Sequence, residues 1–228
     1  MSDDPALQSP FNQIPPIVVA LCLLMAGVEL AFWAQSNGFI AREAVQSWRL
    51  VGVDRYGFFD QGFDRAVSLG AFDLDQVKRM VTYPFIHLSF THMIFAVVLT
   101  LALGKMVGEV FGTMAVLIVW VASGMAGALA FGLILDEARP LLGGYPPVYG
   151  LIGAFTFLLW VNLAGTGQSH RAFSLIALLL GIQLVFGLLF GGTKDWVADV
   201  AGFATGFVLS FLVSPGGWRA LLERLRDR

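Results

Sequence analysis

Long runs of apolar residues alternate along this chain with shorter polar segments. An α-helix needs about 20 mostly apolar residues to cross a bilayer, and each run is close to that length. We expect spans at residues 17–33, 92–107, 114–135, 148–163, 172–190 and 196–213. The pattern therefore predicts an all-α integral membrane protein whose membrane domain, residues 17–213, is a six-helix transmembrane bundle.

The sequence outside these runs predicts two tails and one long loop. Residues 1–16 are polar and acidic and lack the basic start of a cleaved signal peptide. Residues 36–84 mix charged and aromatic side chains, which suits a structured loop at the membrane interface. Residues 214–228 form a basic, amphipathic tail. Because cytoplasmic segments are enriched in Lys and Arg, we expect both tails in the cytoplasm of a bacterial inner (plasma) membrane and the loop outside.

Composition narrows the possible functions. Hydrophobic residues make up 57% of the chain and charged residues 13%, and the mean hydropathy is +0.76, which excludes an ordinary soluble domain. A net charge of -2 gives no indication of nucleic-acid binding. Cys22 is the only cysteine, so no internal disulfide or thiolate cluster can form. His87 and His92 would point about 140° apart on one helix, so we expect no metal site and no cofactor.

One acidic residue inside a predicted span needs an explanation. Glu29 lies among apolar neighbours in the first span, and a carboxylate in lipid is costly unless it is paired or functional. It is either a structural group bonded to a neighbouring span or part of a transport or proton-relay path.

A motif appears just before and within the second span. The string from Phe85 to Phe95, with His87 and His92 five residues apart, resembles the pattern F-x-H-x4-H-L-x-F-N of the rhomboid intramembrane proteases. Arg79 resembles the arginine of that family's Trp-Arg pair, although Lys78 replaces the tryptophan. Further matches follow in the family's order at Ser123-Gly124, at residues 148–154 including Tyr149, and at Gly202 and Gly206. The resemblance covers residues 79–214 and implies a six-helix bundle of rhomboid type.

The same resemblance locates four catalytic positions. In rhomboids a serine in the fourth span and a histidine in the sixth form the catalytic dyad, and a histidine and an asparagine in the second span hold the oxyanion. These positions are occupied here by Tyr145, Asp199, His92 and Ala96. No Ser or Cys occurs in residues 136–160 and no His follows His170, so a shifted alignment restores no dyad. Three of the four positions are therefore replaced and only His92 is retained, so we expect no catalytic residues.

Other residues that match the motifs have structural interpretations. Small residues allow close helix contact in lipid, and we expect this role for Gly124, Gly127, Gly150, Gly153, Gly202 and Gly206. His92 is either a polar packing group or a retained ligand-facing group. Asp199 either accepts a hydrogen bond from Tyr145, which would lock the fourth span to the sixth, or is solvated at the membrane surface or paired with Lys194.

Three functions remain open at this stage. The first is a rhomboid-like pseudoprotease that lies in membrane lipid and binds transmembrane segments of client proteins without cleaving them. The second is an active intramembrane serine endopeptidase with an unrecognised nucleophile, for which Ser89 and Ser123 are the candidates. The third is a small transporter, suggested by Glu29 and Asp199.

Overall fold

The described part of the chain forms helices and the segments that connect them, with one isolated β-bridge between Phe58 and Leu141. The structure is a computed structural model that describes residues 14–41, 46–70, 74–163, 166–190 and 194–215. The long helices are α1 (Pro16–Ser36), α5 (Phe90–Phe111), α6 (Thr113–Ile134), α7 (Tyr145–Asn162), α8 (Ser174–Phe190) and α9 (Trp196–Val213). Most of both predicted tails lies outside the described residues.

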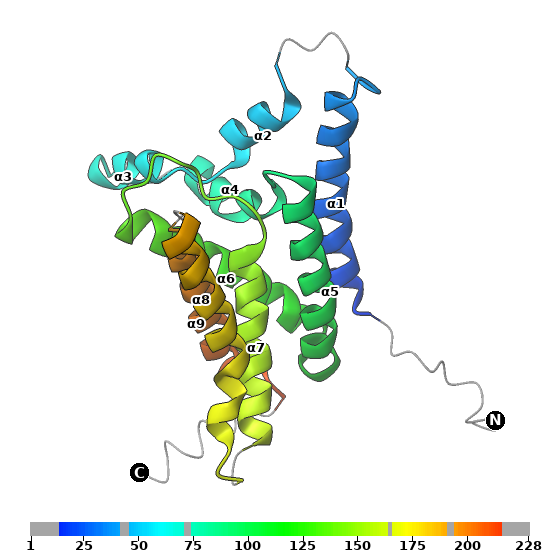
Figure 1. Ribbon diagram of the computed structural model, residues 1–228, viewed down its shortest axis with the longest axis vertical. Coiled ribbons are helices and arrows are strands. Elements are labelled where there is room, and N and C mark those ends of the chain that lie inside the picture. Colours follow the sequence, from blue (N-terminus) through cyan, green and yellow to red (C-terminus); the bar gives the residue numbers. More distant parts are fainter. Residues whose placement is uncertain (1–13, 42–45, 71–73, 164–165, 191–193, 216–228) are drawn as a thin grey trace, which may run out of the picture.

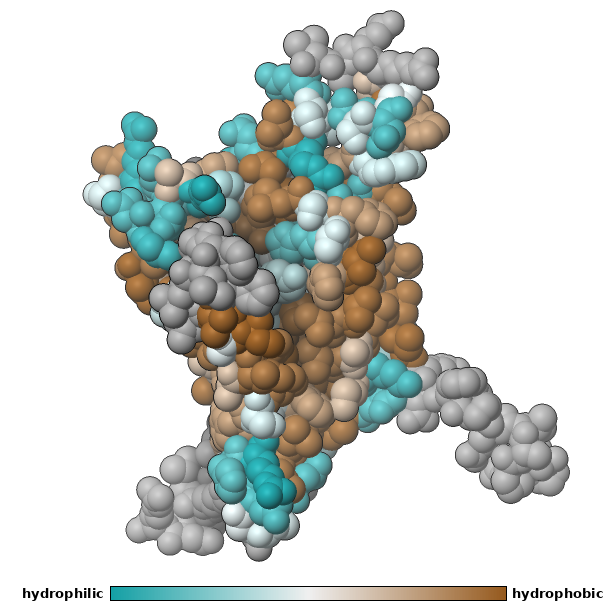
Figure 2. Space-filling model, viewed as in Figure 1, coloured by the Kyte–Doolittle hydropathy of each residue, from teal (hydrophilic) through white to brown (hydrophobic). Residues whose placement is uncertain are grey.

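The long helices form a bundle with an apolar surface. Among the described residues, α1, α5, α6 and α9 are long and apolar enough to cross a membrane, and α7 and α8 run beside them (Figure 1). Figure 2 shows a hydrophobic band over the body of the bundle, with hydrophilic residues gathered at its two ends. The predicted all-α integral membrane fold is confirmed, and each expected span coincides with a helix to within a few residues.

Residues 36–84, expected to form a structured loop, contain short helices that the sequence analysis did not predict. They are α2 (Trp48–Tyr56), α3 (Asp60–Ser68), α4 (Leu74–Thr82) and the 3-10 turn η2 (Tyr83–Phe85). These helices cross one end of the bundle (Figure 1). Helices this short are marginal on their own and depend on tertiary packing, so local sequence alone did not reveal them. At the opposite end, η3 (Ser169–Phe173) joins α7 to α8.

The chain passes back and forth so that α5, α7 and α9 all begin at the end covered by α2–α4, whereas α1 begins and α9 ends at the other (Figure 1). The short connections explain this order. Only Gly112 separates α5 from α6, and its φ of 87° is a left-handed conformation that favours glycine. The antiparallel passage brings residues near the starts of three helices to one end of the molecule.

The centre of the bundle is a close contact between α7 and α9. A Cβ added at Gly206 would lie 1.9 Å from the carbonyl oxygen of Gly150, and one added at Gly202 would lie 2.2 Å from that of Pro146. A Cβ at Gly153 would lie 2.2 Å from the carbonyl oxygen of Phe203. These are distances at which only hydrogen fits, so the two backbones touch.

Helix α6 packs onto the same pair through its own glycines. A Cβ at Gly127 would lie 2.7 Å from Cβ of Pro146, and one at Gly124 would lie 3.3 Å from Cγ of Pro147. Lipid tails are as apolar as the side chains, so burying apolar groups gives little driving force for helix association in a membrane. Close van der Waals packing of this kind is therefore a main source of that association.

Gly206→Ala is expected to destabilise the bundle strongly. The new methyl group would meet backbone atoms of α7, which cannot move aside without separating the helices. Overpacking of a core typically costs 1–3 kcal/mol, and we expect about 3 kcal/mol here. The thermal midpoint of the purified protein in detergent measures the effect. Gly27→Ala is the matched control, since nothing lies within 4 Å of a Cβ at that position; an equal midpoint in both variants would contradict the assigned contact.

Candidate functional site

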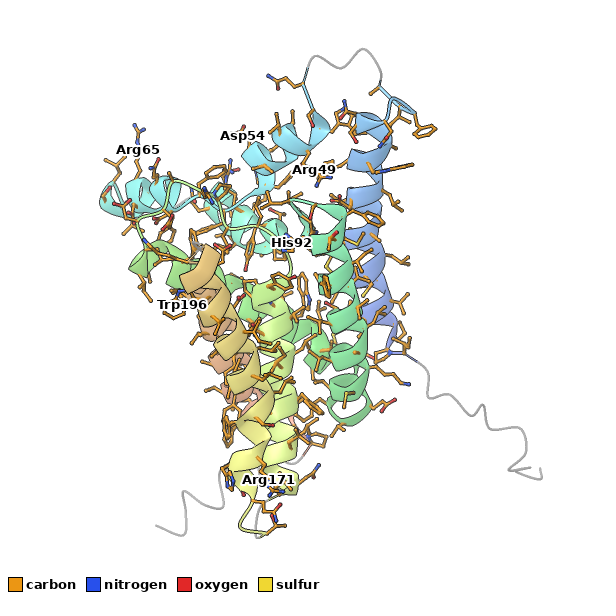
Figure 3. The ribbon with its side chains drawn as sticks, viewed as in Figure 1. Arg49, Asp54, Arg65, His92, Arg171 and Trp196 are labelled. Atoms are coloured by element: carbon orange, nitrogen blue, oxygen red, sulfur yellow. The ribbon has the colours of Figure 1, made fainter. Side chains whose placement is uncertain are left out.

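His92, Tyr145 and Asp199, named from sequence as family-type catalytic positions, lie at the end of the bundle beneath α2–α4. His92 is in the first turn of α5 (Figure 3), Tyr145 is the first residue of α7, and Asp199 is in the first turn of α9. The centroids of the His92 and Tyr145 rings are 4.8 Å apart. The Asp199 carboxylate is near enough to act electrostatically on the Tyr145 phenol, so these three side chains are close together.

The position of the family's oxyanion asparagine holds a methyl group. Ala96 is fully buried in α5, one turn after His92. It packs near the backbone before α7, because a Cβ added at Gly144 would lie 3.4 Å from the Ala96 methyl carbon. Ala96 cannot donate a hydrogen bond from its side chain, so this wall of the site is apolar.

His87 lies outside the helix that carries His92, so the predicted angular separation on one helix is wrong. Ser89 caps α5, and its Oγ accepts a hydrogen bond from the His92 backbone N–H at 3.2 Å. His87 therefore precedes the helix, and its ring centroid is 5.1 Å from that of His92. The Gly144 N–H donates to Nε2 of His87 at 3.4 Å. Within the described residues, no group of three His, Cys, Asp or Glu side chains is placed to hold a metal ion.

Gly143 allows the loop before α7 to press against both histidines. It has a φ of 89°, and a Cβ there would lie 2.5 Å from the His92 ring and 3.4 Å from Cδ2 of His87. Its N–H donates to the Tyr83 carbonyl at 3.1 Å. The Tyr83 hydroxyl in turn donates to the Gly124 carbonyl at 2.9 Å, so the loop is fixed to α6.

The proposals made from sequence for Asp199 need correction. Asp199 is only 2% exposed, so it is not solvated at the membrane surface. Lys194 pairs instead with Glu137 at 2.8 Å. No hydrogen bond joins Tyr145 to Asp199 among the described residues, and the Tyr145 ring lies against His92. An alignment places residues along a helix but does not determine the rotamer, and here the phenol turns toward α5. Tyr149, one turn further along α7, is 5% exposed and packs in the core.

Glu29 is held by an arginine of the long loop and not by a neighbouring span. Arg49 of α2 donates from Nη2 to Oε1 at 2.7 Å and from Nη1 to Oε2 at 2.9 Å. Nη1 also donates to the His87 carbonyl. Glu29 is 1% exposed, and the bidentate arrangement satisfies both of its oxygens. Arg49 therefore connects α1, α2 and the segment that leads to His92 (Figure 3).

Sequence reasoning did not identify Arg49. The only signal was Glu29 itself, because a carboxylate in a span requires a partner. The long loop contains six basic residues, and nothing in the sequence distinguishes the one that reaches α1. The structure adds that Gly52 contacts Phe32, since a Cβ there would lie 2.7 Å from the ring; this close approach brings Arg49 to Glu29.

Arg79, the motif arginine, holds α2 to α4 and lies away from His92. Its Nε donates to Oδ2 of Asp75 at 2.7 Å, and its Nη1 donates to the carbonyls of Asp54 at 2.7 Å and Gly57 at 3.0 Å. Hydrogen bonds from Lys78 and Arg79 keep the pKa of Asp75 below its usual range. Arg79 therefore satisfies the carbonyls at the end of α2 and is an organiser of the loop.

Comparison with known proteins agrees with this arrangement. A family model described as Rhomboid domain matches residues 74–216. The chain belongs to the rhomboid family.

Individual relatives are distant and longer. The chain is 27% identical over 138 residues to RHOMBOID-like protein 7 of Arabidopsis thaliana, covering 60% of this chain and 43% of that protein. It is 29% identical over 164 residues to Rhomboid-related protein 3 of Homo sapiens, covering 67% of this chain and 39% of that protein. It is 26% identical over 144 residues to Inactive rhomboid protein 1 of Danio rerio, covering 62% of this chain and 16% of that protein. The chain thus spans less than half the length of these relatives.

Replacing Arg49 should cost much of the folding stability. Arg49→Ala leaves the Glu29 carboxylate buried without its partner, and breaking a buried pair in this way costs about 3 kcal/mol. Thermal unfolding in detergent measures the loss, with Arg65→Ala as the control because Arg65 is exposed on α3. The double variant Glu29→Gln/Arg49→Ala should lose less than Arg49→Ala alone; an equal or larger loss would argue against an uncompensated charge as the cause.

Stability should decrease with acid because of His87, which lies before α5. Burial, and then the nearby His92, lowers the pKa of His87 to about 3. The unfolded pKa is about 6.5, so between these values the unfolded state binds a proton that the folded state does not. Stability then falls as the pH drops, by about 2 kcal/mol between pH 7 and pH 5. Urea unfolding of the wild type and His87→Gln at both pH values tests this, and equal acid sensitivity would refute it.

Proposed function

We propose that this protein is a rhomboid-family pseudoprotease that binds transmembrane segments of client membrane proteins and does not cleave them. One observation carries the proposal. The two positions at which the resemblance places a nucleophile and a base hold Tyr145 and Asp199, and no histidine side chain is hydrogen-bonded to a serine hydroxyl among the described residues. A serine–histidine mechanism needs an alcohol within hydrogen-bond reach of a histidine.

Two backbone donors are absent from the start of α7. Pro146 and Pro147 occupy its first turn, and neither has a backbone N–H. Each lost donor of an oxyanion site is typically worth about 2.7–4 kcal/mol of transition-state stabilisation. Ala96 in place of the asparagine removes a further donor, whereas the histidine of that site is retained as His92.

The two serines considered for an active peptidase are poorly placed. The Ser89 hydroxyl is the cap of α5 and bonds to a backbone N–H. Ser123 is fully buried in α6, and its hydroxyl has no hydrogen-bond partner among the described residues. It faces the α7 backbone, since a Cβ at Gly150 would lie 2.1 Å from its Oγ. Neither hydroxyl is bonded to a histidine that could activate it.

The transporter alternative loses part of its support. Glu29 is engaged on both oxygens by Arg49, as expected of a structural ion pair. A group that carries ions or protons must exchange partners during its cycle. Asp199 is buried at the contact of α6, α7 and α9, where the backbones are tightly packed.

The packing of the helices supports client binding, and the name of one relative supports the absence of cleavage. Among the residues that the structure describes, those of α8 contact mainly α7 and η3. A helix at the margin of the bundle can move aside for a partner helix at lower cost than one in its centre. A relative is named Inactive rhomboid protein 1.

We propose cytoplasmic termini on the basis of the arginine-rich tail. The bacterial inner membrane remains a prediction, since the relatives compared come from a plant and from animals.

The purified protein should fail to cleave a generic rhomboid model substrate in liposomes, because the nucleophile and base positions hold Tyr145 and Asp199 and part of the oxyanion site is replaced. A known active rhomboid in parallel liposomes provides the control. A fluorophosphonate probe should label the active rhomboid and leave this protein unlabelled. Cleavage that disappears in Ser89→Ala or Ser123→Ala would show that the protein is an enzyme.

Binding requires a separate measurement. Pairs of fluorescently labelled transmembrane peptides and the protein in the same liposomes should show energy transfer above that of a non-interacting control helix. If the protein neither cleaves nor associates with any transmembrane segment in a broad peptide panel, the client-binding proposal fails while the family assignment stands.

A further inference from the structure

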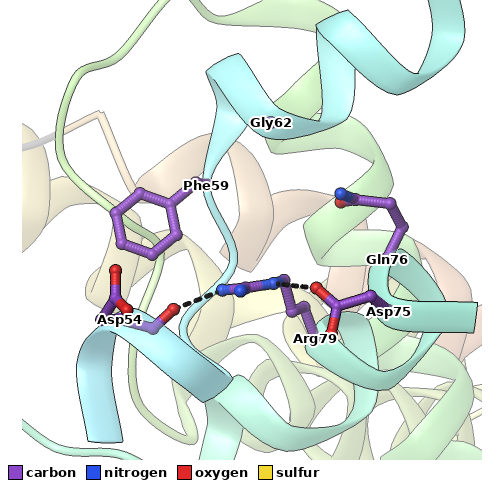
Figure 4. Close-up of a pocket in the computed structure, with 6 residues that line it drawn as sticks. All are labelled: Asp54, Phe59, Gly62, Asp75, Gln76 and Arg79. Carbon is purple, nitrogen blue, oxygen red and sulfur yellow. Dashed lines mark hydrogen bonds and ion pairs between the residues drawn. The ribbon is translucent and has the colours of Figure 1, made fainter. Parts of the chain in front are cut away.

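A pocket of about 250 Å³ opens between α2, α3 and α4. Figure 4 shows the Arg79 side chain lying across it, with Phe59 on one side and Gln76 on the other. Asp54, Gly62 and Asp75 complete the lining. The pocket therefore combines a cation, two carboxylates and an aromatic ring.

The guanidinium of Arg79 keeps one donor group for a ligand. Nε and Nη1 donate the three hydrogen bonds described above. Nη2 donates no hydrogen bond to any of the described residues. The guanidinium is also 5.8 Å from the centroid of the Phe59 ring. Because its other bonds fix it in place, Nη2 is already oriented to bind an anionic oxygen.

The carboxylates differ in availability. Asp75 is occupied by Lys78 and Arg79. Asp54 is exposed, and its side chain has no ion pair within the described part of the chain. Two carboxylates, Lys78 and Arg79 make the surroundings of the pocket close to neutral. A ligand with one negative and one positive group matches this charge pattern better than an anion alone.

The place of the pocket indicates the source of such a ligand. Helices α2–α4 cross the end of an integral membrane bundle, and α3 reaches beyond the long helices (Figure 1). The α3–α4 region exposes Val67 by 51%, Leu69 by 68% and Leu74 by 86%. Apolar side chains this exposed on short amphipathic helices are typical of contact with the bilayer interface. The polar groups available as ligands at the bilayer interface are lipid headgroups.

We propose that this pocket binds the headgroup of a zwitterionic phospholipid, namely phosphoethanolamine. The phosphate accepts from Nη2 of Arg79, and the ammonium lies between the Asp54 carboxylate and the Phe59 ring. An ammonium donates hydrogen bonds that a choline group cannot, and it is attracted to an aromatic face. The proposal stands independently of whether the protein binds or cleaves clients.

Gly62 offers a way to close the pocket without disturbing the loop. A Cβ at this position would lie 3.8 Å from Nε2 of Gln76 and 3.9 Å from Cβ of Phe59, both ordinary contacts. A larger side chain there extends into the pocket. Gly27→Leu is the matched control, because Gly27 is an exposed glycine in α1 with no atom within 4 Å of its Cβ.

Native mass spectrometry of the purified full chain, with equal amounts of palmitoyl-oleoyl phosphatidylethanolamine, phosphatidylcholine and phosphatidylglycerol, tests the proposal. The wild type and Gly27→Leu should retain phosphatidylethanolamine preferentially. Gly62→Leu should bind it about tenfold more weakly. Asp54→Asn should lose the preference over phosphatidylglycerol. The thermal midpoint of each variant confirms that it is folded.

Three outcomes would overturn the assignment. They are undiminished phosphatidylethanolamine binding by Gly62→Leu, no preference among the three lipids in the wild type, and an unchanged preference in Asp54→Asn. Soluble phosphoethanolamine is added in a further arm. If it binds as tightly as the lipid, the ligand is a soluble phosphorylated amine and the membrane source is wrong; weaker binding than the lipid supports the headgroup assignment.

Discussion

The contact between α7 and α9 is set by the absence of side chains on one face of each helix. Gly206 lies against the Gly150 carbonyl and Gly202 against the Pro146 carbonyl. In lipid the helices gain little from burying apolar groups, so touching backbones supply the dispersion that holds them together. Helix α6 joins through Gly124 and Gly127. This trio determines where α7 and α9 begin, and hence the depth of Tyr145 and Asp199 in the molecule.

Two charged contacts extend the fold beyond the long helices. Arg49 binds Glu29 and the His87 carbonyl, so α2 is tied to α1 and to the start of α5. Arg79 ties the end of α2 to α4. Because both arginines act on backbone carbonyls as well as on carboxylates, the segment between α1 and α5 is a structural part of the domain. The position of His92 depends on that segment as well as on its own helix.

Sequence alone predicted the long helices well, because runs of apolar residues of membrane length have few alternatives. It also named Tyr145 and Asp199, which the structure brings close to His92. Contacts between side chains were harder to predict from the sequence. The predicted hydrogen bond from Tyr145 to Asp199 was wrong because an alignment does not determine a rotamer. Arg49 was missed because its partner, Glu29, is 20 residues away in the sequence. The position of His87 was recoverable, since Ser89 is a strong N-cap residue.

Pro146 links the backbone at the start of α7 to the packing of the whole bundle. Pro146 packs against Gly127, and its carbonyl lies against Gly202, so replacing it would loosen the central contact as well as restore an N–H. A serine at position 145 would still need a base at position 199, and the backbone donor at position 146 would still be absent. A substitution at position 146 therefore cannot restore that donor without also changing the packing of α6, α7 and α9, so the chemistry at this end of the bundle and the stability of the bundle depend on one residue.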